Sequence, residues 1–268
     1  MERITSRQNA VVKRFRELAR TAAAVGDADV LLDGVRLVRE ALEAGVAIPV
    51  AAFADRQLRG GDGAEIASAV ARSGGRVYSA SDSVFAAMSP VQHPSGVVAI
   101  GRASAAHLNE AFAGAAPLVL VLAGVQDPGN VGAIVRTAAA LGATSVVAIE
   151  GSADPFGWKA LRGAMGGTFR LPVAARGSIL GVIAAARDRH VRLVAAVPRG
   201  GTPLPSADLR RPTALLLGGE GAGVTDTLLA AADATVTVPM GADVESLNVA
   251  VAAALLLYEA ARQRGTLG

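Results

Sequence analysis

Five polar side chains with complementary chemistry follow apolar runs in the second half of the sequence. The runs are PLVLVLAGV, TALLLGG and ATVTVPM, and the side chains that follow them are Asn130, Arg136, Glu220, Ser246 and Asn248. An amide, a guanidinium, a carboxylate and a hydroxyl that meet at one place could bind a polar substrate and help to move a proton. If the runs are parallel strands, their carboxyl ends share the sheet edge at which open α/β folds bind ligands.

Local structure offers a second explanation for each of these residues. Pro128 and its neighbouring glycines turn the chain and start a helix by themselves, and Arg136 is expected to face away from the buried stripe of that helix. Ser246 is a favoured N-cap for the final helix, which would place Asn248 in the first helical turn. Capping explains either residue well, but it explains both together less well.

The glycine-rich loop 218–223 narrows the class of ligand. Its sequence GGEGAG is neither the GxGxxG dinucleotide fingerprint nor the GxxxxGK[ST] phosphate loop. Glu220 would also repel phosphate groups inside this loop. A nucleoside triphosphate or a nicotinamide cofactor is therefore disfavoured, and a cationic or polar ligand is favoured.

The elements that position these residues fall into two groups. From Val30 to Gly101 short apolar runs alternate with helical patterns, which predicts a small α/β unit. Weak periodicity and small residues indicate a linker before the alternation restarts with longer, almost wholly apolar strands. Such strands predict a parallel sheet covered on both faces. The expected domains are residues 1–103, a linker at 104–117, and residues 118–268.

The composition excludes several classes of protein. The 268 residues are 51% hydrophobic and 18% charged, which is enough apolar material for a sizeable core. No run reaches the 18 or so apolar residues of a membrane span, and the charged N-terminus does not resemble a signal peptide. The chain has no cysteine, and its three histidines lack metal-ligand spacing. We therefore expect a cytoplasmic protein without metal or membrane.

Basic residues gather near the N-terminus. All but two of the 26 basic residues are arginine, and the first helix is expected to bury Val11, Phe15, Leu18 and Ala22. Its opposite side is either a solvated surface or a binding surface for an anionic polymer such as RNA. Six candidate RNA-binding cations lie in the first 20 residues: Arg3, Arg7, Lys13, Arg14, Arg16 and Arg20.

Three segments in order resemble the signature motifs of the SpoU (TrmH-like) family of RNA ribose 2′-O-methyltransferases. They are DPGNVGAIVRTAAALGA, LLLGGEGAGV and VPMGADVESLNVAVAAALLLYEA, and DPFGWKALRGAMGGTFRLPV resembles the family's middle segment. Ala139 and Ala250 stand where relatives often carry a polar residue. The segments ITSRQNAVVKRFREL and LLDGVRLVREALEAG are similar to an attached substrate-binding domain, which itself resembles ribosomal protein L30e.

The resemblance implies an α/β fold in which a small L30e-like domain precedes a parallel-sheet domain with a C-terminal trefoil knot. It also implies a homodimer whose active site is completed across the interface. The implied reaction is methyl transfer from S-adenosylmethionine to a ribose 2′-hydroxyl, most readily in large-subunit rRNA. A tRNA methyltransferase and a catalytically silent RNA-binding protein are the alternatives. The implied cofactor-binding residues are Leu217, Gly218, Val238, Pro239, Met240 and Leu247.

The role of Arg136 has two interpretations. The resemblance implies that it acts as general base with the help of an RNA phosphate. Arginine side chains keep their proton above pH 12, so a clamp on the phosphate and the nascent alkoxide is equally economical. In either case Asn130, Glu220, Ser246 and Asn248 are expected to orient Arg136, the ribose and the methionine end of the cofactor.

Overall fold

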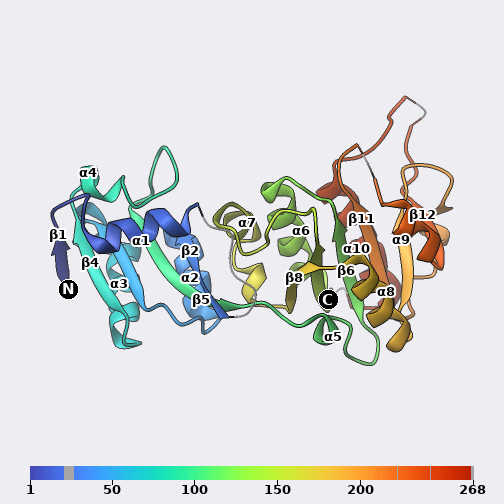
Figure 1. Ribbon diagram of the computed structural model, residues 1–268, viewed down its shortest axis with the longest axis horizontal. Helices are drawn as coiled ribbons and strands as arrows, with labels where there is room; N and C mark the ends of the chain where they lie inside the picture. The colour runs from blue at the N-terminus through green and yellow to red at the C-terminus, as the bar shows by residue number, and fades with distance from the viewer. Residues whose placement is uncertain (21–26, 222, 242, 267–268) are drawn as a thin grey trace.

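The protein has two sheets that lie side by side along its long axis (Figure 1). The computed structural model describes residues 1–20, 27–221, 223–241 and 243–266. The N-terminal sheet occupies the left of Figure 1 and the C-terminal sheet the right. This arrangement agrees with the expected small α/β unit followed by a larger one.

The N-terminal sheet has five strands in the order β1-β4-β3-β5-β2. Its parallel pairs are β1 with β4 and β3 with β4, whereas β5 runs antiparallel to β2 and β3. The strands are β1 (Glu2–Ile4), β2 (Asp27–Asp33), β3 (Val50–Ala54), β4 (Arg76–Ala80) and β5 (Val97–Ser104). The helices are α1 (Ala10–Leu18), α2 (Val35–Glu43), η1 (Asp55–Arg59), α3 (Gly61–Arg72) and α4 (Asp82–Phe85).

The buried face of α1 differs by one position from the expected one. Val12 and Phe15 are fully buried, whereas Val11 and Leu18 are only half-buried and Ala22 lies outside the described residues. The Asn9 side chain accepts a hydrogen bond from the Val11 amide and so caps the helix. The cap fixes where the helix begins, and the tertiary contacts then turn Val12 rather than Val11 into the core.

The C-terminal sheet has seven strands, all of whose described pairs are parallel, in the order β10-β12-β9-β11-β6-β7-β8. Every residue of β6 is buried, which confirms the parallel sheet predicted from the apolar runs. The strands are β6 (Leu118–Ala123), β7 (Ser145–Ile149), β8 (Val173–Gly177), β9 (Arg192–Ala196), β10 (Thr202–Pro203), β11 (Thr213–Gly218) and β12 (Ala234–Thr237).

Helices cover both faces of this sheet. On one face α6 and α10 pack against Leu120 and Leu122 of β6, and on the other α8 and α9 pack against Val119 and Val121. The alternation follows from the period of two along a strand. The helices are α5 (Leu108–Ala111) in the expected linker, α6 (Pro128–Ala140), α7 (Trp158–Ala164), η2 (Gly167–Phe169), α8 (Ile179–Asp188), η3 (Leu204–Ser206), α9 (Asp226–Ala231) and α10 (Val249–Arg264).

Helix α6 carries Asn130 and Arg136, and two features fix its place. The Asp127 carboxylate accepts a hydrogen bond from the backbone N–H of Asn130, with Pro128 at the first helical position. A Cβ added to Gly132 would lie 2.3 Å from the Ala160 carbonyl oxygen, so only glycine lets α6 and α7 approach so closely.

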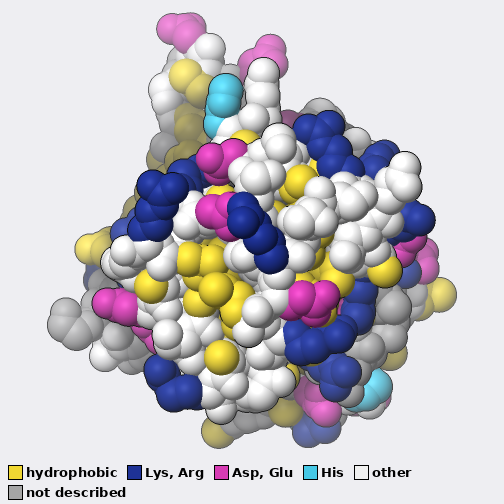
Figure 2. All heavy atoms as spheres, turned by 90° about the vertical axis from the view of Figure 1, so that its left-hand side faces the viewer, with side chains coloured by type: hydrophobic (Ala, Val, Ile, Leu, Met, Phe, Trp, Pro, Cys, Tyr) yellow, Lys and Arg dark blue, Asp and Glu magenta, His cyan; other side chains and the backbone are white. Residues whose placement is uncertain are grey.

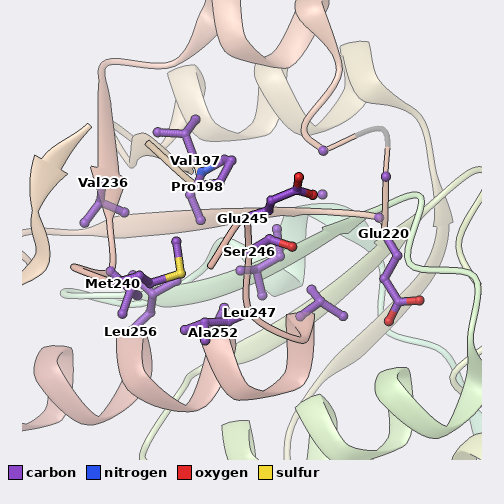
Figure 3. Close-up of a pocket in the computed structure, with 18 residues that line it drawn as sticks. Val197, Pro198, Glu220, Val236, Met240, Glu245, Ser246, Leu247, Ala252 and Leu256 are labelled. Carbon is purple, nitrogen blue, oxygen red and sulfur yellow. The ribbon is translucent and has the colours of Figure 1, made fainter. Parts of the chain in front are cut away.

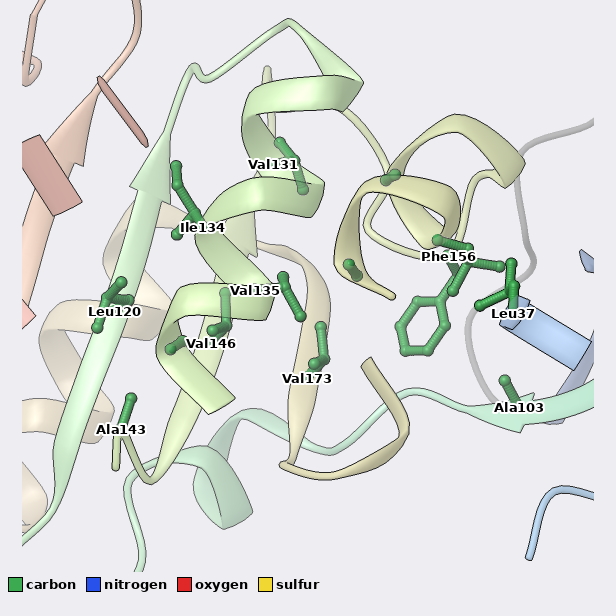
Figure 4. Close-up of a cluster of buried hydrophobic side chains, with 14 of the residues drawn as sticks. Leu37, Ala103, Leu120, Val131, Ile134, Val135, Ala143, Val146, Phe156 and Val173 are labelled. Atoms are coloured by element: carbon green, nitrogen blue, oxygen red, sulfur yellow. The ribbon is translucent and has the colours of Figure 1, made fainter. Parts of the chain in front are cut away.

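The two sheets share one hydrophobic cluster. Phe156, 6% exposed, extends this cluster from the C-terminal domain to Leu37 and Ala103 of the N-terminal domain (Figure 4). Arg170 pairs with Glu40 at 2.6 Å, and the Arg162 guanidinium lies 3.6 Å from the buried carboxylate of Asp33. The junction therefore combines apolar packing with two ion pairs.

The last turn of α10 is tied to segments distant in the sequence. The Arg264 guanidinium donates hydrogen bonds to the carbonyl oxygens of Ala116, Leu209 and Arg211. The trefoil knot itself stays a prediction. Within the described ranges no helix combines the length and the apolar character needed to span a membrane.

Candidate active site

A cavity of about 380 Å³ opens at the carboxyl ends of β9, β11 and β12 and is closed by α10. Figure 3 shows Val236, Met240 and Leu256 at one end and Glu220 at the other, with Ser246 and Leu247 between them. Five further lining residues, which Figure 3 does not label, are Leu217, Gly218, Gly219, Val238 and Val249. The site lies at the sheet edge that the sequence predicts.

Glycines make the floor of this cavity possible. A Cβ added to Gly218 would lie 1.9 Å from the Gly223 carbonyl carbon, and one added to Gly219 would lie 1.9 Å from the Gly124 carbonyl oxygen. Distances this short to backbone atoms cannot be relieved by a rotamer change. The loop after β11 therefore folds back on itself and against the end of β6 only because side chains are absent there.

A hydrogen-bonded polar cluster borders the cavity. The Asn130 Nδ2 donates to Glu220 Oε1 at 2.6 Å, and the Asn248 Nδ2 donates to Asn130 Oδ1 at 3.2 Å. Residues from three separate segments, 90 and 118 positions apart, thus meet as predicted from the strand ends. The chain of bonds fixes which side of the Asn130 amide faces Glu220.

Asn248, not Ser246, caps the final helix. Its Oδ1 accepts hydrogen bonds from the amides of Ala250 and Val251 at 2.9 and 3.3 Å, and α10 begins at Val249. The prediction that Ser246 is the N-cap is therefore wrong by two residues. The reason is physical, because an asparagine at the cap satisfies two orphan amides and still leaves its Nδ2 for Asn130. Ser246 instead lines the cavity.

Arg136 stands apart from this cluster within one chain. Six residues after Asn130 on α6, it is about 9 Å further along the helix axis and rotated by roughly 240°. Its side chain is exposed and has no hydrogen-bond or ion-pair partner among the described residues. Its backbone is held in place by Gly167, whose added Cβ would lie 3.1 Å from the Arg136 Cα.

Five of the six expected cofactor residues line the cavity. Pro239 is exposed and is not among the described lining residues. Sequence reasoning missed Val197 and Pro198, which follow β9, and Glu245 in the loop before α10. The first two could have been found, because the apolar run VRLVAAV is followed by Pro198, just as the apolar run ATVTV is followed by Pro239.

The cavity has the chemistry that a sulfonium cofactor requires. Glu220 and Glu245 both line the cavity, and its other end is apolar, so a cation and a flat aromatic group can both be accommodated. The residues present therefore fit S-adenosylmethionine, which carries a sulfonium, an ammonium and an adenine.

The six predicted RNA-binding cations are all exposed but differ in their partners. Arg3 pairs with Asp55 at 2.8 Å, Arg7 donates to the Ser83 carbonyl oxygen, and Arg14 pairs with Asp29. Figure 2 views this end of the molecule, where basic side chains are spread among acidic and hydrophobic ones. In the described part of the chain no partner is found for the other three cations: Lys13, Arg16 and Arg20.

Known proteins resemble the chain over almost its whole length. It is 33% identical to the 23S rRNA (guanosine(2553)-2′-O)-methyltransferase RlmP of Bacillus subtilis over 258 residues, covering 96% of this chain and 98% of that protein. The structure of an AdoMet-bound rRNA methyltransferase from Sinorhizobium meliloti superposes with a TM-score of 0.84 at 28% identity, covering 97% of each chain. That of AviRb from Streptomyces viridochromogenes with AdoMet gives 0.83 at 26% identity, covering 96% of this chain and all of the other.

Two family models account for the two sheets. The model of the MRM3-like substrate binding domain matches residues 9–99, and that of the SpoU rRNA methylase family matches residues 117–258. The polar cluster and the cavity both lie within the second match. The predicted family is confirmed, and the chain belongs to the SpoU rRNA methylase family.

Proposed function

We propose that this protein transfers a methyl group from S-adenosylmethionine to a ribose 2′-hydroxyl of 23S-type large-subunit rRNA. The observation that carries the proposal is the cavity with its two carboxylates, bordered by the bonded side chains of Asn130, Glu220 and Asn248. Relatives named as 23S rRNA 2′-O-methyltransferases support the substrate. Solved relatives with AdoMet support the cofactor.

The residues have distinct roles in this proposal. Bound S-adenosylmethionine supplies a methyl group that its sulfonium charge has already activated. Glu220 lies at the end of the cavity where this charge is stabilised, and it holds the Asn130 amide in one orientation. Ser246 lines the path between cofactor and ribose. Arg136 binds an RNA phosphate and stabilises the ribose oxygen, whose proton would pass to that phosphate or to water as the bond from oxygen to the methyl group forms and the bond from the methyl group to sulfur breaks.

A second copy of the chain completes the site. On α10 the side chains of Val251, Leu255 and Tyr258 are 49%, 39% and 53% exposed and lie on one face, at spacings of four and three residues. Helix α10 packs beside α6, the helix that carries the exposed Arg136. A homodimer formed through this face would cover the apolar stripe and bring Arg136 of the partner subunit to the polar cluster.

The N-terminal domain, residues 1–103, binds the RNA and is joined by the linker 104–117 to the methyltransferase domain, residues 118–268. Arg7, Arg16 and Arg20 line one hollow of about 380 Å³ together with the segment 86–90. Several guanidinium groups around one concavity suit a phosphate backbone, and RNA affinity should then fall with rising salt. The protein would act in the cytoplasm, where rRNA is made and assembled in bacteria such as those of its relatives.

The first experiment incubates the protein with radiolabelled S-adenosylmethionine and separate transcripts of 23S rRNA and tRNA. Label in rRNA that disappears when the target ribose is 2′-deoxy is the expected result. Label in tRNA alone would retain the chemistry and overturn the substrate. Cofactor binding without any transfer to rRNA, tRNA or ribosomal subunits would overturn the enzymatic proposal.

Mixing two inactive variants tests the shared site. Arg136→Ala and Asn130→Ala homodimers are each expected to be inactive. If Arg136 acts across the interface, random reassortment of the two gives about a quarter of intact sites, and activity returns to that level. Arg189→Ala, which removes an exposed arginine at the end of α8, is the matched control and should stay fully active. No recovery in the mixture would mean that Arg136 serves its own chain.

A further inference from the structure

A second cavity lies at the same edge of the C-terminal sheet. It measures about 390 Å³ and is formed at the ends of β7 and β8, on the opposite side of β6 from β11 and the cofactor cavity. We call it the β7–β8 cavity. Its lining residues are Ala148, Ile149, Glu150, Gly151, Ser152, Ala153, Asp154, Pro155, Ala175 and Arg176. None of these residues has a part in the reaction described above.

The wall of this cavity is fixed to the segment that leads to Asn130. The Ser152 hydroxyl donates to the Leu122 carbonyl oxygen at 2.8 Å and accepts from the Gly124 amide at 3.0 Å. The Ala153 amide donates to the Val125 carbonyl oxygen at 2.8 Å. The loop 150–153 is thus bonded to the end of β6 and to the residues just before the α6 cap. Whatever occupies the cavity is held at a fixed position relative to the polar cluster.

Arg176 occupies an unusual backbone position beside this cavity. The pairing of β7 with β8 shifts there, because Ala148 pairs with Ala175 and Ile149 pairs with Gly177. Arg176 is therefore the additional residue of a β-bulge, with φ of +57°. Left-handed backbone is costly for a residue with a side chain and is uncommon outside glycine. The bulge directs an exposed guanidinium to the rim of the cavity.

The lining suits a nucleotide. Most of its wall is apolar, from Ile149, Pro155 and three alanines, which matches the faces of a flat base. The carboxylate of Glu150, which is exposed, can accept hydrogen bonds from the N–H groups at a base edge, as acidic side chains do from exocyclic amines. Asp154 shapes the wall instead, because its Oδ1 accepts a hydrogen bond from the Phe156 backbone amide at 2.8 Å. The guanidinium of Arg176 can bind the attached phosphate.

We propose that the β7–β8 cavity binds one nucleotide of the RNA target site, with its base between the ends of β7 and β8 and its phosphate on Arg176. The base would leave its stack to enter, as bases do in other enzymes that modify nucleic acids. The ribose to be methylated is then positioned between this cavity and the cofactor cavity, at Asn130. This inference rests on the proposed RNA methyltransferase function and adds a substrate subsite to it.

Two substitutions test the subsite without disturbing the core. Arg176→Gly removes the guanidinium and keeps the left-handed backbone, and Glu150→Gln removes a carboxylate from an exposed position. Each is expected to raise the KM for RNA about tenfold or more, the loss typical of one specific nucleotide contact. The Kd for S-adenosylmethionine, measured by calorimetry, should be unchanged. Arg189→Ala again serves as the control for a lost surface charge.

The outcomes separate this inference from the function on which it rests. A KM for RNA within twofold of wild type in both variants would overturn the subsite and leave the methyltransferase function standing. If the wild-type protein binds RNA but transfers no methyl group, the function fails, and the subsite is judged by whether Arg176→Gly weakens RNA binding in a fluorescence anisotropy titration. If the wild-type protein does not bind RNA, both are overturned.

Discussion

Asn248 combines a structural and a functional bond in one side chain, and substitutions can separate them. Its Oδ1 caps α10, and its Nδ2 donates to Asn130. Asn248→Ala removes both bonds. Asn248→Asp keeps an oxygen for the cap, but it replaces the donor with an acceptor that repels Asn130 Oδ1. Asn248→Ser also keeps a capping oxygen, but its side chain is too short to reach Asn130.

The expected magnitudes follow from these bonds. Loss of an asparagine cap costs about 1 kcal/mol. For a chain of 268 residues this corresponds to a fall in Tm of about 2 °C in Asn248→Ala and to almost none in the other two variants. Loss of one hydrogen bond worth about 1 kcal/mol should lower kcat/KM about fivefold in all three variants, because the Asn130 amide is then free to turn away from Glu220.

Thermal unfolding and methyl transfer are measured on the same preparations of the four proteins. The reasoning about the cap is refuted if Asn248→Asp loses as much Tm as Asn248→Ala. The reasoning about the polar cluster is refuted if Asn248→Asp retains the wild-type kcat/KM. Unchanged cofactor affinity in Asn248→Ser would show that the loss arises in the cluster and not from a collapsed cavity.

Three further predictions concern the framework that holds the site. Gly132→Ala should lower the free energy of unfolding by about 1–3 kcal/mol in urea, because its Cβ would overlap the Ala160 carbonyl; Ala133→Gly, at the next position, should cost less. Phe156→Ala should cost about 3–5 kcal/mol and Phe156→Leu much less, and equal losses would contradict a packed junction. Burial raises the pKa of Asp33, although Ser89 and Arg162 oppose the rise. The folded state therefore binds the Asp33 proton more tightly than the unfolded state does. Above the raised pKa the ionised carboxylate lowers the free energy of unfolding, and this loss disappears as the pH falls towards 3.8. The Tm of Asp33→Asn, relative to the Tm of wild type, should therefore increase as the pH rises through this window. A difference in Tm that stays constant would show that Asp33 does not titrate there.

Much of the C-terminal sheet could be predicted from the sequence because its signals are local. The apolar run of β6 and the Asp-Pro pair at the start of α6 each specify an element without reference to the rest of the chain. The meeting of Asn130, Glu220 and Asn248 could be predicted because parallel strands bring their carboxyl ends together. The start of α10 could not be predicted to the residue, because Ser246 and Asn248 are both good caps.

Features that depend on distant partners were beyond prediction. Nothing in the run of residues around Gly132 indicates that Ala160 will press against it, and the ion pair of Arg162 with Asp33 joins two domains. The bulge at Arg176 arises from the register between two strands, whereas the pattern of apolar residues reports only which face each residue takes. Arg136 was expected to face away from the buried stripe, but only the structure shows that it has no side-chain partner among the residues described.

The order of strands has a consequence during synthesis of the chain. Strand β6 is the first strand of its sheet to be synthesised. One of its edges pairs with β7, but the other stays unpaired until β11 has emerged. The cofactor cavity is closed only after α10 has emerged. Arg264 then bonds to the carbonyl of Ala116, just before β6, and so joins the end of the domain to its beginning. A nascent chain can therefore expose a folded N-terminal domain while it has no cofactor site. It cannot methylate RNA until its last helix has left the ribosome that makes it.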